Sequence, residues 1–451
     1  MLSPEIMKRL PALITWTVAA IALIAIALWP QYVEHRTDEA RAASFPTAAP
    51  VTKDYLLRDK TIAFWERAVR ERHPGDMLSP QNLAEQYLQR YRERGDIDDV
   101  LRAQHMAYAA WRAQPRFNVP AMVAVASVDL TLHRFKEALA MTKAIESFDK
   151  NDEQMEVREA SLDMEIGRYA AARHVLDHLP PEGRFDIARD TIEARYAELT
   201  GHLAEARTLL ERPTALANSQ FDSPAQSRAW FFFRSGEMAF EAGDNDAAID
   251  DENQATRIFP GYADALRAQA RFECALHRWN DCLTHATASA NVVPYPETLG
   301  YEADAQRALG DAAGAARTDD LIRTIERIGN AQHISDRLLA IYYSEHRIHT
   351  ADAYAIAHRE LAVRDDIFTE DTLAWAAAMD GRWGEARTAI GKALQFDTEN
   401  SLLQYHAGVI AQHFGDLEQA KRRFHKALAL NPQFHQTYAD DARARLAALG
   451  A

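Results

Sequence analysis

The sequence predicts an all-α protein in which antiparallel helix pairs stack into a solenoid, preceded by one transmembrane helix. Three observations lead to this prediction: a length of 451 residues, a pattern of glycine and alanine that recurs every 34 residues, and a charge-free apolar run near the N-terminus. A chain this long exceeds one compact core, so several domains or a repeat array is expected. Because 47% of the residues are hydrophobic, the chain can bury a large core.

The apolar run is "LPALITWTVAAIALIAIALWPQYV", residues 10–33. About 20 apolar residues in a helix cross the hydrocarbon core of a bilayer, so the run is long enough to span it. Trp29 and Tyr32 stand at its end in place of the small residues of a cleavage site, which favours an uncleaved anchor over a signal peptide. Lys8 and Arg9 favour a cytoplasmic N-terminus, residues 1–9, and an exported body. The alternative is a core helix of a soluble protein.

The next two segments lead into the repeats. Residues 34–53 are polar and alanine-rich with two prolines, which is typical of a linker. Residues 54–80 place apolar side chains at helical spacing up to His73-Pro74-Gly75, so we expect one leading helix followed by a loop.

A repeat begins to show in four segments: "GRYAAARHVL" from Gly167, "GHLAEARTLL" from Gly201, "GRWGEARTAI" from Gly381 and "GDLEQAKRRF" from Gly415. Each has a turn glycine, an apolar residue two positions later, an alanine five later and a bulky apolar residue nine later. The first two glycines are 34 residues apart, and so are the last two. Such a period indicates helical hairpins that bury a shared core by stacking.

In the last copy, Gly408, Gly415, Leu417, Ala420, Phe424, Ala427 and Pro432 closely resemble the tetratricopeptide repeat pattern. Small residues let the two helices of a hairpin approach, so Gly408 is expected to face Ala420 while Phe424 fills the seam. The resemblance implies a right-handed superhelical solenoid over residues 81–435, with about nine to ten copies, several of them degenerate. Copies are placed near Gln81, Val119, Glu153, Ile187, Ala229, Ala263, Pro296, Asn330, Ile367 and Ser401. Residues 436–451 are expected to form a capping helix.

Tetratricopeptide arrays usually offer a concave groove built from the first helix of each pair, and the resemblance implies such a groove here. Aromatic anchors with nearby charges suit the binding of a peptide. The alternative is that the aromatic side chains pack between neighbouring repeats. The candidate groove residues are Trp230, Phe233, Phe240, Arg267, Arg271, Arg307, Trp375, Tyr405 and Gln412.

The stretch "RFECALHRWNDCLTHA" holds the only two cysteines, Cys274 and Cys282, beside His277 and His285. Three interpretations stay open: a disulfide, two free core thiols, or a zinc site of all four side chains. Folding the hairpin brings both cysteines to similar heights, and an exported compartment favours oxidation. The Cys-x7-Cys spacing is similar to that of cysteine-rich Sel1-like repeat proteins, which staple helix pairs with it.

Composition and motifs bound the function. A formal net charge of −15 argues against nucleic acid as a partner. The sequence contains no Gly-rich phosphate loop, His-Glu-x-x-His pair or Gly-x-Ser-x-Gly elbow, so we expect neither an enzyme nor a cofactor. The favoured function is a scaffold in the bacterial inner membrane, single-pass, with a periplasmic body that binds envelope proteins or peptides.

Two alternatives remain from the sequence. One is a structural envelope protein that associates with itself, as a homo-oligomer, and has no peptide groove. The other is a metal-binding or enzymatic protein centred on Cys274 and Cys282.

Overall fold

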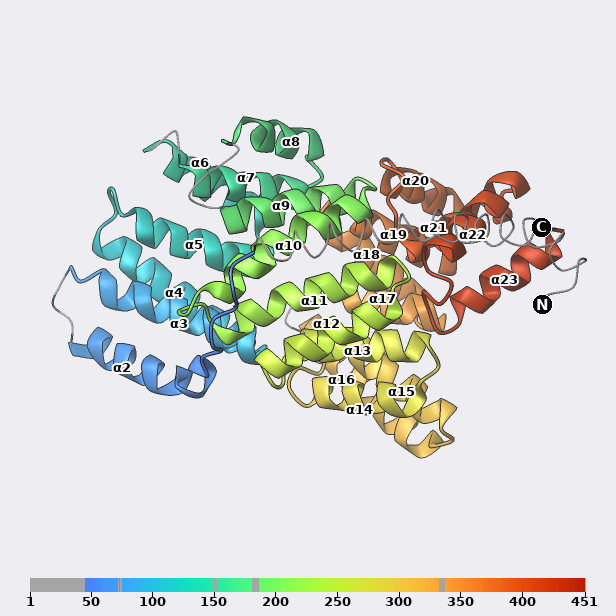
Figure 1. Ribbon diagram of the computed structural model, residues 1–451, viewed down its shortest axis with the longest axis horizontal. Coiled ribbons are helices and arrows are strands. Elements are labelled where there is room, and N and C mark those ends of the chain that lie inside the picture. Colours follow the sequence, from blue (N-terminus) through green and yellow to red (C-terminus); the bar gives the residue numbers. More distant parts are fainter. Residues whose placement is uncertain are drawn as a thin grey trace, which may run out of the picture. The chain divides into compact units, whose positions relative to one another are not determined.

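A computed structural model of the chain describes residues 45–71, 73, 75–148, 152–180, 186–331 and 337–450. The chain divides into two units, Met1–Ala49 and Pro50–Ala451, and the second unit holds every helix of the described residues. All regular structure in these residues is helical, as Figure 1 shows. The helical solenoid predicted from the sequence is therefore confirmed.

The helices of the second unit follow one another as a leading helix, ten hairpins and a final helix. The leading elements are η1 (Asp54–Leu56) and α2 (Arg58–Glu71). The hairpins are α3 (Leu78–Arg94) with α4 (Ile97–Ala113), α5 (Val119–Thr131) with α6 (Phe135–Glu146), α7 (Glu153–Glu165) with α8 (Tyr169–His178), α9 (Asp186–Leu199) with α10 (Leu203–Ser219), α11 (Ala225–Glu241) with α12 (Asn245–Ile258), α13 (Ala263–Ala275) with α14 (Trp279–Ala290), α15 (Pro296–Ala308) with α16 (Ala312–Ala331), α17 (Arg337–His346) with α18 (Thr350–Glu360), α19 (Ile367–Met379) with α20 (Trp383–Ala393), and α21 (Ser401–His413) with α22 (Leu417–Leu430). The final helix is α23 (Tyr438–Ala448).

Polar side chains begin many of these helices. Asn118, Asp152, Asp366 and Asn400 stand before first helices of hairpins, and each accepts a hydrogen bond from a backbone N–H in the first turn. Asp416 does the same before α22. These caps satisfy N–H groups that have no partner inside the helix, so they fix where each helix begins.

Small residues set the distance between the two helices of a hairpin. A Cβ atom built on Gly408 in α21 would lie 2.6 Å from Cε1 of Phe424 in α22. Ala420, Phe424 and Ala427 are fully buried. Phe424 therefore fills the seam as predicted, and the side chain nearest to Gly408 is Phe424 rather than the expected Ala420.

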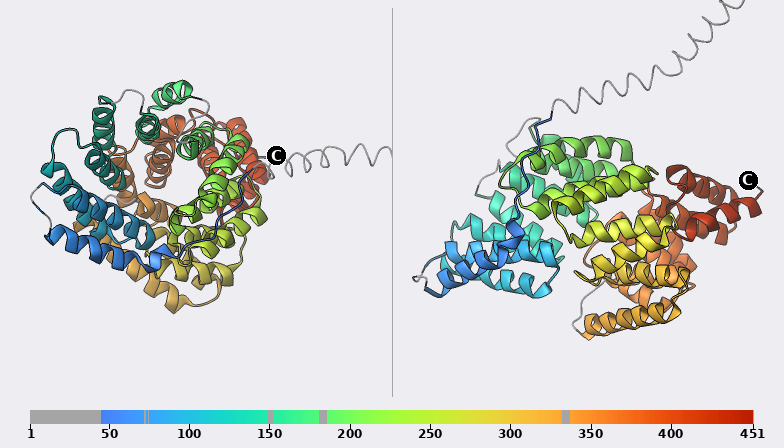
Figure 2. Two further views of the ribbon diagram at one scale, coloured as in Figure 1. Left: turned by 60° about the vertical axis from the view of Figure 1, so that its left-hand side comes forward. Right: turned by 60° about the horizontal axis from the view of Figure 1, so that its bottom comes forward.

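The solenoid turns far enough for successive turns to touch. The backbone N–H of Asp365 donates to the Glu165 carbonyl at 3.2 Å, and the Thr398 hydroxyl donates to the Leu199 carbonyl at 2.7 Å. Nδ2 of Asn431 donates to the Phe240 carbonyl at 2.7 Å. Asp365 and Thr398 precede first helices that lie six hairpins after their acceptors, and Asn431 follows α22, five hairpins after its acceptor on α11. Figure 2 (left) shows the resulting ring of helices.

The acceptors in these contacts are carbonyl groups at the ends of first helices, which have no partner within the helix. The glycines that follow are packed equally tightly. A Cβ on Gly167 would lie 2.3 Å from the Asp365 carbonyl oxygen, and one on Gly243 would lie 2.7 Å from that of Leu430. The turn glycines of α7 and α11 thus serve both their own hairpin and the contact with the following turn.

One copy of the repeat was predicted to start near Asn330. In the structure α16 continues to Ala331, and the first helix of that hairpin is α17, which begins at Arg337.

The predicted anchor, residues 10–33, lies outside the described residues. Among the helices that are described, none is both long and apolar enough to cross a membrane.

Candidate functional site

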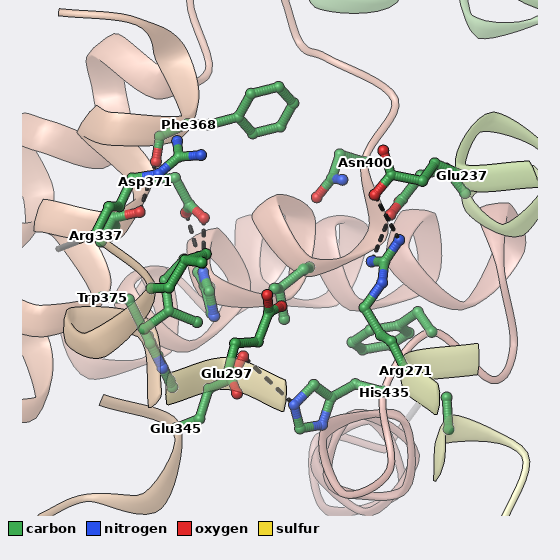
Figure 3. Close-up of a pocket in the computed structure, with 18 of the residues that line it drawn as sticks. Glu237, Arg271, Glu297, Arg337, Glu345, Phe368, Asp371, Trp375, Asn400 and His435 are labelled. Carbon is green, nitrogen blue, oxygen red and sulfur yellow. Dashed lines mark hydrogen bonds and ion pairs between the residues drawn. The ribbon is translucent and has the colours of Figure 1, made fainter. Parts of the chain in front are cut away.

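The inner face of the superhelical turn encloses a cavity of about 360 Å³. Its wall is built by the first helices of seven successive hairpins, α9, α11, α13, α15, α17, α19 and α21, and by the loop between α22 and α23. Figure 3 shows how side chains from these separate elements converge. The second helices of the same hairpins contribute none of the residues that line it.

Charged side chains form a continuous ladder on α9, α11 and α13. Glu198 lies between two guanidinium groups, at 2.7 Å from Arg195 and 2.8 Å from Arg234. Glu237 contacts Arg234 and lies 3.7 Å from Arg271, which in turn lies 3.3 Å from Glu241. Because each acid has an arginine beside it, the ladder neutralises itself and holds its side chains in place.

The ladder shifts the protonation equilibria of its members. Burial alone would raise the pKa of the Glu198 carboxyl, but Arg234 and Arg195 outweigh it and lower that pKa to about 2. Burial raises the pKa of Glu241, and the single contact with Arg271 only partly offsets it. The ladder therefore keeps Glu198 ionised at any pH at which the protein would work.

A further ion pair, between Arg267 and Glu297, extends the ladder from α13 to α15. Nη1 of Arg267 lies 2.7 Å from a carboxylate oxygen of Glu297, and the Tyr301 hydroxyl donates to Glu297 at 2.9 Å. Burial opposes ionisation of Glu297, yet Arg267 and Arg271 lower its pKa. Arg271 also lies over the rings of Phe240 and Phe272, at 5.0 and 5.1 Å from their centroids. The aromatic side chains beneath thus hold the arginine in its position on the wall.

On α17, α19 and α21 the wall is more apolar. Leu338, Ile341, Phe368 and Leu402 are partly exposed, and all four line the cavity. Trp375 stacks on His406, with 4.2 Å between ring centroids and 13° between planes, and donates its indole N–H to the Tyr438 hydroxyl at 3.2 Å. The cavity therefore combines a charged wall with an apolar one.

Two histidines each pair with an acid at the cavity. Nδ1 of His406 lies 3.0 Å from Asp371, and Nε2 of His435 lies 3.6 Å from Glu345. Within the described part of the chain, Nε2 of the buried His406 has no hydrogen-bond partner. Figure 3 shows the pair of His435 and Glu345 beside the cavity. The described residues contain no group of three or more His, Cys, Asp or Glu side chains placed to hold a metal ion.

Of the candidate groove residues, Arg267, Arg271 and Trp375 line this cavity together. Trp230 lines a separate pocket of about 270 Å³ beside Tyr262 and Tyr295. Figure 1 shows its helix, α11, next to α12 and α13.

The other candidate groove residues lie elsewhere. Phe233, Phe240 and Tyr405 are buried in the core, so they pack between helices as the alternative interpretation proposed. Arg307 pairs with Asp304 and Asp319 outside the cavity. Gln412 accepts a hydrogen bond from Arg445 at 2.7 Å and does not line the cavity either. The groove is therefore built differently from the one that the repeat positions implied.

Several lining residues were missed by sequence reasoning. Arg195, Glu198, Arg234, Glu237 and Glu241 form most of the ladder. In the sequence, these residues form a pattern of arginine and glutamate at helical spacing on consecutive first helices. An ordinary solvated helix face shows the same spacing, so the signal becomes specific only when the turn encloses that face.

In the structure, Cys274 and Cys282 form a disulfide. The Cα atoms of Cys274 and Cys282 lie 5.3 Å apart and their sulfur atoms are bonded, which joins α13 to α14. His277 contacts the Gln436 carbonyl at 2.9 Å through Nε2, and His285 contacts Glu273 at 2.7 Å through Nδ1. Because the disulfide uses both thiols and each histidine has another partner, the alternative zinc set does not assemble.

Comparisons with known proteins find similar folds at low identity. No family model matches the sequence, and no curated protein matches it. The chain is similar to the crystal structure of PilW, a widely conserved type IV pilus biogenesis factor, at 13% identity and a TM-score of 0.39, with 46% of this chain and 94% of that one covered. It is similar to yeast Tom70 at 10% identity and a TM-score of 0.33, with 82% and 96% covered. A chain of the APC/C hetero-tetramer Cut9-Hcn1 matches at 12% identity and a TM-score of 0.32, with 87% and 94% covered.

Proposed function

We propose that the protein is a scaffold that binds an extended segment of a partner protein inside its superhelical turn. The observation that carries the proposal is the cavity itself, whose wall consists of the first helices of seven successive hairpins. Its volume of about 360 Å³ lies at the lower end of ligand sites, which span roughly 300–1,000 Å³, so it suits a chain segment better than a folded domain.

The apolar wall and the charged wall suit, respectively, the apolar side chains and the polar groups of an extended polypeptide. Leu338, Ile341, Phe368 and Leu402 offer apolar contact to side chains. The ladder on α9, α11 and α13 presents polar atoms that ion pairs already hold in place, so little ordering is needed when a partner binds. A partner that contacts both walls gains affinity from the apolar side and orientation from the charged side.

The proposal also places the scaffold in a cell. Residues 10–33 anchor it in a bacterial inner membrane, residues 1–9 lie in the cytoplasm, and the solenoid lies in the periplasm. Support comes from the charge-free run and from the disulfide between Cys274 and Cys282, since disulfides persist in oxidising compartments. A C-terminal alkaline phosphatase fusion should be active, because that enzyme folds only after export. Activity only in a cytoplasmic reporter at the same position would contradict this placement.

The binding proposal is tested by changing the apolar wall. The double variant I341E/L402E places two carboxylates in the cavity. We expect the amount of partner recovered in a pull-down from solubilised membranes to fall by about tenfold or more, because an unpaired charge in an apolar contact costs a few kcal/mol. The matched control is L321E/L417E, which changes two leucines that are exposed on α16 and α22. Circular dichroism should show that both variants stay folded.

Equal recovery of the same partners by both variants would contradict the binding proposal. If I341E/L402E also kept a self-association seen by analytical ultracentrifugation, the alternative of a structural homo-oligomer would be favoured.

A further inference from the structure

The leading helix α2 is held firmly against the first hairpin by its inner face. Ile62 is buried against Leu83 and Ala84 of α3. Arg58 lies 2.8 Å from the buried Glu93, and Asp59 lies 2.9 Å from both Arg90 and Arg94. Because these contacts fix the rotation of α2, its opposite face has a defined composition.

That opposite face exposes large apolar side chains. Leu56, Leu57 and Phe64 have exposed fractions of 66%, 56% and 54%, and Val51 just before them has 41%. Leu57 and Phe64 are seven residues apart, which places them on the same side of the helix. Single exposed leucines are ordinary on a soluble protein, but four large apolar side chains exposed within 14 positions of the chain, two of them on one side of α2, are a concentration of apolar surface.

The same face is cationic. Lys53, Lys60, Arg67 and Arg70 are exposed, and none forms an ion pair with another residue that the structure describes. The acids nearby are mostly engaged: Asp54 with Arg58, Asp59 with Arg90 and Arg94, and Glu66 with the Tyr87 hydroxyl. Glu71 is the one exposed acid of α2 without a described partner. This cationic patch stands on a chain whose net charge is −15.

We propose that the outer face of η1 and α2 lies on the surface of an anionic lipid bilayer. Apolar side chains flanked by lysine and arginine on one face of a helix are what an interfacial helix presents to lipid. The inference rests on the proposed function, because the anchor at residues 10–33 would bring this face to a membrane. Val51 follows Val33 by 18 residues, so the connection spans at most about 60 Å when fully extended. The contact fixes how the solenoid stands on the membrane.

The test uses the full chain, reconstituted into vesicles, with an environment-sensitive dye on one new cysteine. A63C is suitable because Ala63 is exposed on the outer face of α2, whereas Cys274 and Cys282 are buried and bonded to each other. The control position is L321C, where an exposed leucine stands on α16. Vesicles contain phosphatidylcholine alone or with phosphatidylglycerol, together with a spin-labelled lipid that quenches the dye.

We expect quenching at position 63 in vesicles with phosphatidylglycerol and none at position 321. L57S/F64S should abolish it, and K60Q/R67Q should weaken the contact by about fivefold for each cation removed. The matched charge control is R317Q/R422Q, at exposed arginines of α16 and α22, which should leave the quenching unchanged.

Resistance of the same protein to carbonate extraction reports the anchor separately. Quenching at position 63 in a protein that carbonate extracts would uphold the lipid contact and refute the anchor. An anchored protein without quenching at position 63 would overturn the lipid contact, and photo-crosslinks from that position to a protein would then assign the patch to a protein partner. Equal quenching in neutral vesicles would overturn the role of the cations.

Discussion

Glu252 on α12 shows at the scale of one residue how the charged wall is backed. Its carboxyl is fully buried, and neither oxygen has a hydrogen-bond partner among the described residues. Gly236 of α11 packs directly on it, since a Cβ there would lie 2.7 Å from Oε1 of Glu252. Burial raises the pKa of Glu252 well above its usual value, and the nearby Glu237 adds to the shift. The side chain is therefore protonated in the folded protein at pH values where it would ionise in the unfolded chain.

This shift predicts a pH-dependent stability that E252Q removes. The folded protein keeps a proton that the unfolded chain releases near pH 4.5, so the free energy of unfolding should fall as the pH rises above that value, by up to about 1.4 kcal/mol per pH unit, until the folded pKa is reached. Urea denaturation of wild type and E252Q between pH 4 and 8 measures the difference. E418Q, at an exposed glutamate of α22, is the control. A constant difference between wild type and E252Q over this range would refute the protonation.

The candidate groove residues show which residue types the repeat pattern places correctly. The repeat pattern identified first-helix residues, and the charged ones, Arg267 and Arg271, do face the cavity. The aromatic candidates lie in two environments. Trp375 lines the cavity, while Phe233 and Tyr405 are buried between helices. A buried arginine without a partner is too costly, so charge predicts the open face, whereas an aromatic side chain is stable on either side.

At the scale of elements, the hairpins follow the sequence closely. First helices begin at Val119, Glu153, Ala263, Pro296 and Ile367, where the repeat pattern placed copies. The pattern succeeds because turn residues and small residues at the helix contact are local requirements. It failed near Asn330, where α16, which is 20 residues long, continues past that position to Ala331.

The turn glycines give a test of the contact between successive turns. Gly243 and Gly381 have nearly the same backbone, with φ of 77° and 79°, so alanine costs about 1–2 kcal/mol of backbone strain at either site. Only Gly243 packs against the next turn, whereas a Cβ on Gly381 would meet nothing within 4 Å. We expect G243A to lose about 1–3 kcal/mol more unfolding free energy than G381A, because the Leu430 carbonyl must move. Equal losses in urea denaturation would mean that the turns do not touch in solution.

The disulfide is the other element-scale feature open to measurement. Closing a loop with a sequence separation of 8 should stabilise the fold by about 2–3 kcal/mol in the chain-entropy model. C274A/C282A should lose about that much, and dithiothreitol should destabilise the wild type but not the variant. Labelling of both cysteines in unfolded, unreduced protein would show instead that they are free thiols.

At the scale of the whole molecule, the cavity exists because the solenoid closes a full turn. The angle between neighbouring hairpins sets how many are needed for closure, and that angle depends on the side chains at every contact, so the repeat pattern leaves it open. The contacts from Asp365, Thr398 and Asn431 to carbonyls five or six hairpins earlier fix the turn. The inner faces of the first helices thereby line one shared cavity.

The most direct test of binding inside the turn is photo-crosslinking in living cells. A photoreactive phenylalanine analogue replaces Ile341 or Leu402 on the cavity wall, or Leu321 on the outer surface of α16 as a control. Binding inside the turn predicts that both cavity positions crosslink to the same segment of one partner polypeptide, and that position 321 does not. Crosslinks from position 321 alone, or none from positions 341 and 402, would contradict it.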